Sequence, residues 1–134
     1  MGTRSLTHIK DQEGRKTLMT IYRQMDGYPS GMGDDLKKIL EPLELVNGYN
    51  GDRPQANGMG CAAAQIVAGL KDGVGGIYIY PTNSKDCWED YVYTVRPAGE
   101  TFRLTVAYSD GTKIFDGLIA DFDGATVENA ENDE

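Results

Sequence analysis

The sequence predicts a single α+β domain in which an antiparallel sheet of about six strands carries two helices on one face. Three observations indicate this fold: short apolar runs with strand-like alternation, two segments with helical spacing, and turn signals that separate them. The predicted element order is ββααββββ, which is typical of helices gathered on one side of an antiparallel sheet. At 134 residues, the chain has the length of one domain with its own core.

A β-hairpin is predicted at the start of the chain. Residues 4–10 place apolar side chains among polar ones, and residues 18–22 (Leu-Met-Thr-Ile-Tyr) form the second strand after a turn at residues 11–14. This hairpin brings Arg4 and His8 within possible reach of Arg23. Whether these side chains share a face depends on the strand register, which one sequence does not determine.

Two helices are predicted next. Asp34 and Asp35 suit the positively polarised start of the first helix, and residues 61–71 form an alanine-rich second helix that stops at an Asp-Gly pair. Between the helices, residues 47–60 form a long polar loop. Loops of this length are uncommon inside compact domains and are often functional.

Four further strands complete the predicted sheet, at residues 77–80, 91–95, 102–108 and 114–122. Hairpin signals connect the last three of them. The domain is therefore expected to span residues 1–123. Residues 124–134 are rich in acids and contain no base, so they are predicted to form a flexible, solubilising tail.

Composition excludes several classes of function. The formal net charge of -8 disfavours contact with nucleic-acid phosphates, so no direct nucleic-acid partner is expected. No apolar run is long enough to span a bilayer, which predicts a cytoplasmic protein with no membrane partner. Cys61 and Cys87 are expected to be free thiols, and with His8 as the single histidine the sequence predicts neither a metal site nor a cofactor.

The first candidate site is the segment from Tyr22 to Gly33 (Tyr-Arg-Gln-Met-Asp-Gly-Tyr-Pro-Ser-Gly-Met-Gly). A turn accounts for Asp26 and for the glycines and proline around it. It does not account for Arg23, Gln24 and Tyr28. The guanidinium of Arg23 suits a phosphate or carboxylate, with an internal pair to Asp26 as the alternative.

The second candidate site is the glycine-rich segment of Asn57, Gly58, Met59 and Gly60, which leads into the second predicted helix. Backbone N–H groups at a helix start bind anions well. The alternative is that these glycines serve only the turn, because neither a Walker motif nor a complete dinucleotide-binding glycine motif is present. Tyrosines near both segments could stack on a base or simply pack in the sheet.

No catalytic or metal-binding residue is predicted. The candidate ligand-binding residues are Arg4, His8, Tyr22, Arg23, Gln24, Asp26, Tyr28, Asn57, Gly58 and Gly60.

Three stretches together resemble a family of small uncharacterised proteins from bacteriophages, prophages and bacterial genomes. They are the opening Met-Gly-Thr-Arg-Ser-Leu-Thr-His-Ile, the segment from Tyr22 to Gly33, and Asn-Gly-Met-Gly-Cys-Ala-Ala-Ala-Gln at residues 57–65. The resemblance covers roughly the first half of the chain. It implies a setting in which small proteins counter host defence, by sequestering nucleotide signals or by blocking effector proteins.

These features lead to three functional hypotheses. The first is a non-catalytic module that binds a small anionic ligand such as a nucleotide. The second is an acidic inhibitor of a host nucleic-acid-handling defence complex, comparable to an anti-CRISPR protein. The third is a small enzyme, which would need His8, Asp26 or Cys61 brought together by the fold. The expected partner is thus a small anionic ligand or a host protein, in the host cytoplasm for a phage-encoded chain, and homo-oligomerisation stays open.

Overall fold

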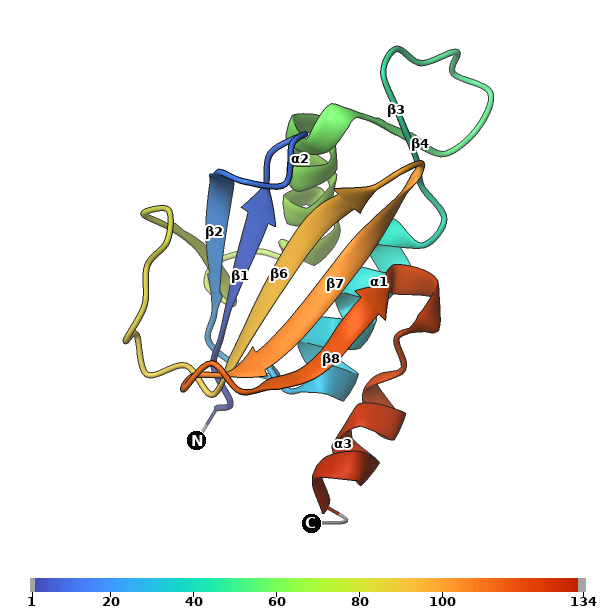
Figure 1. The fold of residues 1–134 in the computed structure, drawn as a ribbon. Helices are drawn as coiled ribbons and strands as arrows, with labels where there is room; N and C mark the ends of the chain where they lie inside the picture. The colour runs from blue at the N-terminus through green and yellow to red at the C-terminus, as the bar shows by residue number, and fades with distance from the viewer. Residues whose placement is uncertain (1, 133–134) are drawn as a thin grey trace.

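The computed structural model describes residues 2–132 as an α+β domain with a curved sheet in front of a helical layer (Figure 1). The strands are β1 (Ser5–Lys10), β2 (Thr17–Arg23), β3 (Glu44–Val46), β4 (Gln55–Asn57), β5 (Ile77–Tyr80), β6 (Tyr91–Ala98), β7 (Thr101–Tyr108) and β8 (Lys113–Leu118). The helices are α1 (Asp34–Leu40), α2 (Gly58–Leu70) and α3 (Gly124–Asn132). A π-helical turn, η1 (Pro29–Gly33), leads into α1, and a 3-10 turn, η2 (Ile119–Asp121), follows β8. The predicted α+β single domain with a six-stranded sheet is confirmed.

The main sheet is mixed, so the prediction of a wholly antiparallel sheet is wrong for one strand pair. Its strand order is β5-β2-β1-β6-β7-β8, and β1 runs parallel to β6. Parallel neighbours need a long connection. The chain provides it through the α1 to β5 segments and the loop at residues 81–90, which returns from the β5 edge to the start of β6 (Figure 1).

The core lies between the sheet and the helices α1 and α2. Strand alternation directs Ile9, Ile21, Val95 and Leu104 to this side, where they are fully buried together with Ile66 of α2. Burial of aliphatic side chains of this size contributes roughly 1.5–3 kcal/mol each, which makes this layer the main source of stability.

Helix α3 occupies the segment that the sequence predicts to be a flexible tail. Val127 is buried, and Gly124 donates its N–H to the carboxylate of Asp34 at 2.9 Å. The hydroxyl of Tyr108 donates to Glu131 at 2.6 Å, and that of Tyr91 at 3.1 Å. Acidic composition alone did not reveal that these groups have partners in the fold. Residues 133 and 134 of the predicted tail lie outside the described residues.

Other boundaries also differ from the prediction. Helix α2 begins at Gly58 rather than at residue 61, and the polar loop before it contains β4, which pairs in parallel with β3. The last strand ends at Leu118, before η2. Between residues 2 and 132, no helix combines the length and apolar character needed to cross a membrane.

Candidate functional site

The two glycine-rich segments do not form one pocket. The first lies where β2 ends at Arg23, beside the C-terminal end of α2, and lines a cavity of about 580 Å³ with Gly69 and Leu70. The second lies at the opposite end of α2, where Met59 contacts Gln12 of the β1–β2 turn. Helix α2 has 13 residues, and at 1.5 Å per residue it separates the two segments by roughly 20 Å.

Arg23 has a structural role, because its guanidinium is bound by groups of the protein. Its side chain is only 16% exposed, and its Nη1 forms an ion pair with Asp35 at 2.7 Å, while Nε donates to the carbonyl of Met25 at 2.8 Å. The cavity beside it also receives Asp26, Asp72 and Lys38. Once Arg23 and Asp35 neutralise each other, these remaining groups leave a net negative charge. The C-terminal end of α2 adds partial negative charge, so this cavity is poorly suited to an anion.

The turn after β2 explains Asp26 and Tyr28 structurally. Asp26 has a φ of 61°, its carbonyl accepts the N–H of Met32 at 2.9 Å, and its carboxylate accepts the Tyr28 hydroxyl at 3.2 Å. That hydrogen bond and the negative charge of Asp26 raise the pKa of Tyr28. A Cβ at Gly31 would overlap the carbonyl oxygen of Asp26, so glycine is required there. Gln24 is exposed, and its backbone N–H bonds Gly76.

In the predicted anion cradle at residues 57–60, one N–H group already has a side-chain acceptor within the protein. The N–H of Met59 donates to the side-chain oxygen of Gln12 at 3.0 Å, and the side-chain oxygen of Asn57 accepts the N–H of Gly48 at 2.7 Å. Gly58 has a φ of 81°, which favours glycine, whereas a Cβ at Gly60 would meet nothing within 4 Å. These residues form a helix start with neutral partners.

The remaining predicted residues lie apart from both segments. Arg4 precedes β1, and its carbonyl accepts the N–H of Asp90. Tyr22 and His8 face away from the helices, where Tyr22 is 8% exposed and stacks on Tyr80 with ring centroids 4.8 Å apart. Of the ten predicted residues, only His8 lies beside the cations described next.

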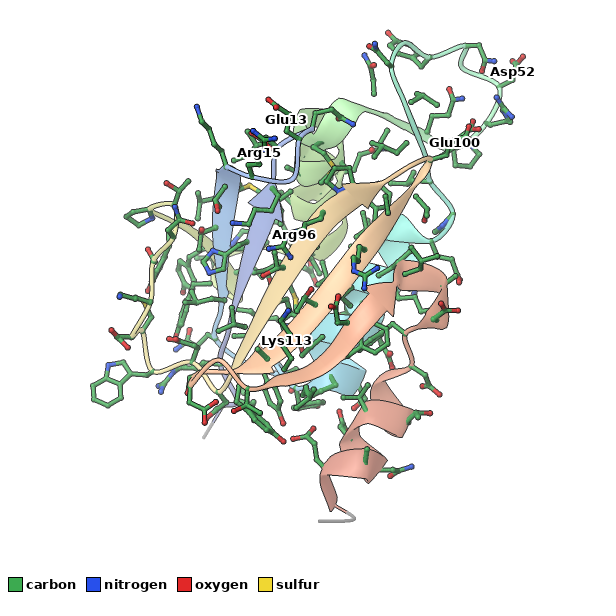
Figure 2. The ribbon with its side chains drawn as sticks, in the orientation of Figure 1. Glu13, Arg15, Asp52, Arg96, Glu100 and Lys113 are labelled. Carbon is green, nitrogen blue, oxygen red and sulfur yellow. The ribbon has the colours of Figure 1, made fainter. Side chains whose placement is uncertain are left out.

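A row of three cations crosses the side of the sheet turned away from α1 and α2, called here the open face. Arg96 of β6 lies directly opposite Arg103 of β7. Lys10 of β1 follows the Ile9–Val95 pair by one residue, which places it next to Arg96. Lys10, Arg96 and Arg103 are called the cationic row. Figure 2 shows Arg96 in front of the sheet, on the side opposite the helices.

The three side chains of the cationic row differ in how far neighbouring groups balance their positive charge. Arg103 donates from Nε to Asp116 at 2.8 Å, and Lys10 donates to the Thr17 hydroxyl at 2.9 Å. Within residues 2–132, no ion pair or side-chain hydrogen bond engages the guanidinium of Arg96. Burial, together with the positive charge of Arg96, lowers the pKa of Lys10. Like charges opposite one another destabilise a sheet, so packing does not explain this row.

Two bulges, one between β1 and β2 and one between β7 and β8, shape the open face. The β1–β2 register shifts between Ile9 and Lys10, which brings Thr17 opposite Lys10. A second shift between Val106 and Ala107 brings Lys113 opposite Ala107. Bulges redirect side chains and are frequent near functional sites. Here they add Lys113, which is labelled in Figure 2, to the cations on this face.

His8 lies two residues before the cationic row's Lys10 on the same face of β1, and its imidazole offers a neutral hydrogen-bond donor. Its Nδ1 is 2.9 Å from the Thr20 hydroxyl, which also accepts the N–H of Asn83. That hydroxyl has its own hydrogen left for Nδ1, which favours a proton on Nε2. Burial and the charge of Lys10 lower the pKa of His8, while Glu89 opposes them, so the ring is neutral near pH 7.

The loop at residues 81–90 covers the other half of this side of the sheet. Asn83 bonds both Thr17 and Thr20, and Leu6 is fully buried although it faces away from the helices. The part left accessible is therefore formed by β6, β7 and β8, with Lys10 and His8 at its border.

The described residues contain no group of three or more His, Cys, Asp or Glu side chains arranged to hold a metal ion. The three residues considered for an enzyme lie on different parts of the fold: His8 on the open face, Asp26 in the turn after β2, and Cys61 on α2, where its thiol contacts Gln65. They form no catalytic constellation.

A sequence signal for the cationic row exists in the hairpin around Gly99. Counting outward from this turn pairs Arg96 with Arg103 on one face, together with Thr94 and Thr105. Sequence reasoning did not select this row, because it sought ligand chemistry in the glycine-rich loops and considered the late strands only as elements of the sheet. Lys10 lies on β1, the parallel neighbour of β6, close to the N-terminus. No local sequence pattern therefore indicates that it lies beside Arg96.

Comparisons of this chain with protein-family models, with curated proteins and with solved structures gave no match.

Proposed function

We propose that this chain is a non-catalytic binding protein for a small anionic ligand, which lies on the open face against the cationic row. The observation that carries the proposal is Arg96, a guanidinium between two other cations with no acidic partner within residues 2–132. In a chain of net charge -8, acids are plentiful, yet none of those within residues 2–132 pairs with this side chain. An anionic ligand would remove the repulsion that the fold leaves uncompensated.

The neighbouring polar groups fit the same ligand. His8 Nε2 and the Thr94 hydroxyl have no partner within residues 2–132, and both lie in the strand positions next to the cationic row. Neutral donors beside cations suit phosphate or carboxylate oxygens. The ligand class in this proposal is a nucleotide or nucleotide signal, and the setting is counter-defence in the host cytoplasm.

A binding experiment with matched variants tests the proposal. Calorimetric titration with ATP and with a cyclic dinucleotide at low salt should show binding that the double variant Lys10→Ala/Arg96→Ala weakens by about tenfold or more. Lys38→Ala removes a cation from the cavity beside Arg23 and should leave binding unchanged. Circular dichroism establishes that each variant folds. Loss of binding in the Lys38 variant alone would move the site to that cavity, and no binding by any anion would refute the proposal.

A second candidate function, docking to a basic protein surface, rests on Trp88. This side chain is 83% exposed, and Asp86 and Asp90 flank it in the loop at residues 81–90. Exposed tryptophans are enriched among the residues that dominate protein interfaces. The proposed interface lies on the loop rather than on α3, because Glu131 of α3 already accepts hydrogen bonds from two tyrosines.

Parallel affinity purifications from host cells separate the two candidates. A protein retained by the wild-type chain and by Lys10→Ala/Arg96→Ala, but lost with Trp88→Ala, supports docking through the loop. Tyr49→Ala, which removes another exposed aromatic at 72% exposure, is the matched control. Equal retention by all variants argues against a role for Trp88.

A further inference from the structure

Among the described residues, the open face carries no aromatic side chain beside the cationic row. Register and alternation place a set of short or cationic residues on the exposed side of β6 and β7. Its members are Val92, Thr94, Arg96, Ala98, Thr101, Arg103, Thr105 and Ala107. The aromatic residues of these two strands point to the opposite side, where Tyr93 and Phe102 are fully buried.

The tyrosines on the same side of the sheet are already engaged. Tyr22 is 8% exposed, stacks on Tyr80 at 4.8 Å and lies 6.1 Å from Tyr78. They belong to β2 and β5, with β1 between them and β6. Proteins that read nucleobases on a sheet present aromatic rings for stacking, and here no free ring lies beside the cations.

We infer that the ligand is recognised through a chain of phosphates and not through a base, so the site takes an oligophosphate group. This inference rests on the proposed function and specifies its ligand. The cationic row crosses three neighbouring strands and so spans two interstrand gaps, about 10 Å in total. Such a line of charge faces several phosphates at once, while a single phosphate would contact one or two cations.

The donors around the row support the same chemistry. Arg96 can place two parallel N–H groups on one phosphate, and Lys10 acts as a point charge beside it. The Thr94 hydroxyl and His8 Nε2 add short, neutral donors at the next strand position. All these groups can donate hydrogen bonds to phosphate oxygens, and none offers a surface for a purine or pyrimidine ring.

A ligand series isolates the phosphate contribution. Titrations at one fixed low salt concentration compare inorganic triphosphate, ATP, AMP and adenosine. Triphosphate and ATP should bind within about threefold of each other, AMP about tenfold or more weakly, and adenosine not detectably. Affinity for triphosphate should fall steeply as salt increases.

Two variants make the result specific to the cationic row. Arg96→Ala should weaken triphosphate binding by about tenfold, and Arg96→Lys should restore part of it, since lysine keeps the charge but loses the paired N–H groups. ATP binding more than tenfold tighter than triphosphate would overturn the inference while leaving the proposed function intact. If neither compound binds, both the inference and the proposed function fail.

Discussion

The cavity beside Arg23 and the open face around Arg96 each contain an arginine next to other charged groups, but they differ in how those charges are balanced. Arg23 is 16% exposed and pairs with Asp35 at 2.7 Å, and the cavity around it has more acids than bases. Arg96 sits between Lys10 and Arg103 and has no acidic partner within residues 2–132. The fold accounts for the first arginine and leaves the second unexplained.

This contrast shows that the number of unusual residues in a segment is a weak guide to a binding site. The segment from Tyr22 to Gly33 has the more conspicuous composition, yet its Asp26, Tyr28 and Gly31 hold one another in place. The cationic row is inconspicuous in the sequence, because its members come from three strands. Whether a charge is satisfied is the more informative criterion.

The largest effect on stability should come from a substitution in the segment from Tyr22 to Gly33. Gly31→Ala should lower the free energy of unfolding by about 2–3 kcal/mol, because the new methyl group overlaps the carbonyl oxygen of Asp26. Gly60→Ala is the matched control. It lies in α2 with open space around it and should stabilise the protein by about 0.5–1 kcal/mol. Urea denaturation measures both values, and a neutral Gly31→Ala would show that the turn relaxes easily.

Replacing Arg23 or Arg96 by alanine should distinguish the two regions, because the free energy of unfolding should change with a different sign. Arg23→Ala should cost about 1–2 kcal/mol of stability, since it deletes an ion pair and a hydrogen bond to the Met25 carbonyl from a largely buried position. Arg96→Ala should leave stability unchanged or slightly higher, because it removes repulsion. Equal destabilisation by both substitutions would mean that Arg96 also has a packing role.

Reversing the charge at Arg96 should separate stability from binding. Arg96→Glu places a carboxylate between Lys10 and Arg103, and should raise stability by about 0.2–1 kcal/mol by creating opposite-charge pairs across the strands. The same change should abolish binding of inorganic triphosphate. Thermal unfolding and calorimetric titration of the one variant test both effects, and unaltered binding would exclude the cationic row as the site.

The smallest effect concerns pH and His8. Its pKa is lowered below the ordinary value of 6.5 by burial and by Lys10, against the opposing charge of Glu89. Below pH 6.5 the unfolded chain therefore binds a proton before the folded one does, so stability should decrease as pH falls through this window. Above about pH 7 both states are neutral at this residue, and the contribution vanishes.

Comparison with His8→Gln isolates this titration, because the chain has no other histidine. The difference in unfolding free energy between wild type and variant should change between pH 7.5 and 5.5. The wild type should lose the greater stability on acidification. A constant difference over this range would show that the pKa of His8 is not lowered.

Much of the fold was predictable because it depends on local patterns. Alternating apolar residues gave the six main strands, and helical spacing gave α1 and α2. The parallel β1–β6 pair was not predictable, because nothing in residues 4–10 specifies which later strand lies beside them. Helix α3 was missed because its few apolar positions, such as Val127, become meaningful only against η1 and β8.

The candidate site was predictable only in part. Sequence reasoning selected His8, and it selected Arg23 as a ligand contact although Asp35 neutralises it in the fold. It did not select Arg96 or Arg103, since a charge on a strand is usually solvated and unremarkable. A charge becomes informative only when its spatial neighbours are known.

The sequence by itself determined the class of fold, the main strands and helices, and the turns, because these follow from the periodicity of side chains along a strand or helix and from the backbone freedom of glycine. The tertiary structure alone decided which charges are satisfied. Coulomb interactions depend on distance in space, and Lys10, Arg96 and Arg103 become neighbours only when β1 pairs with β6 and β6 with β7.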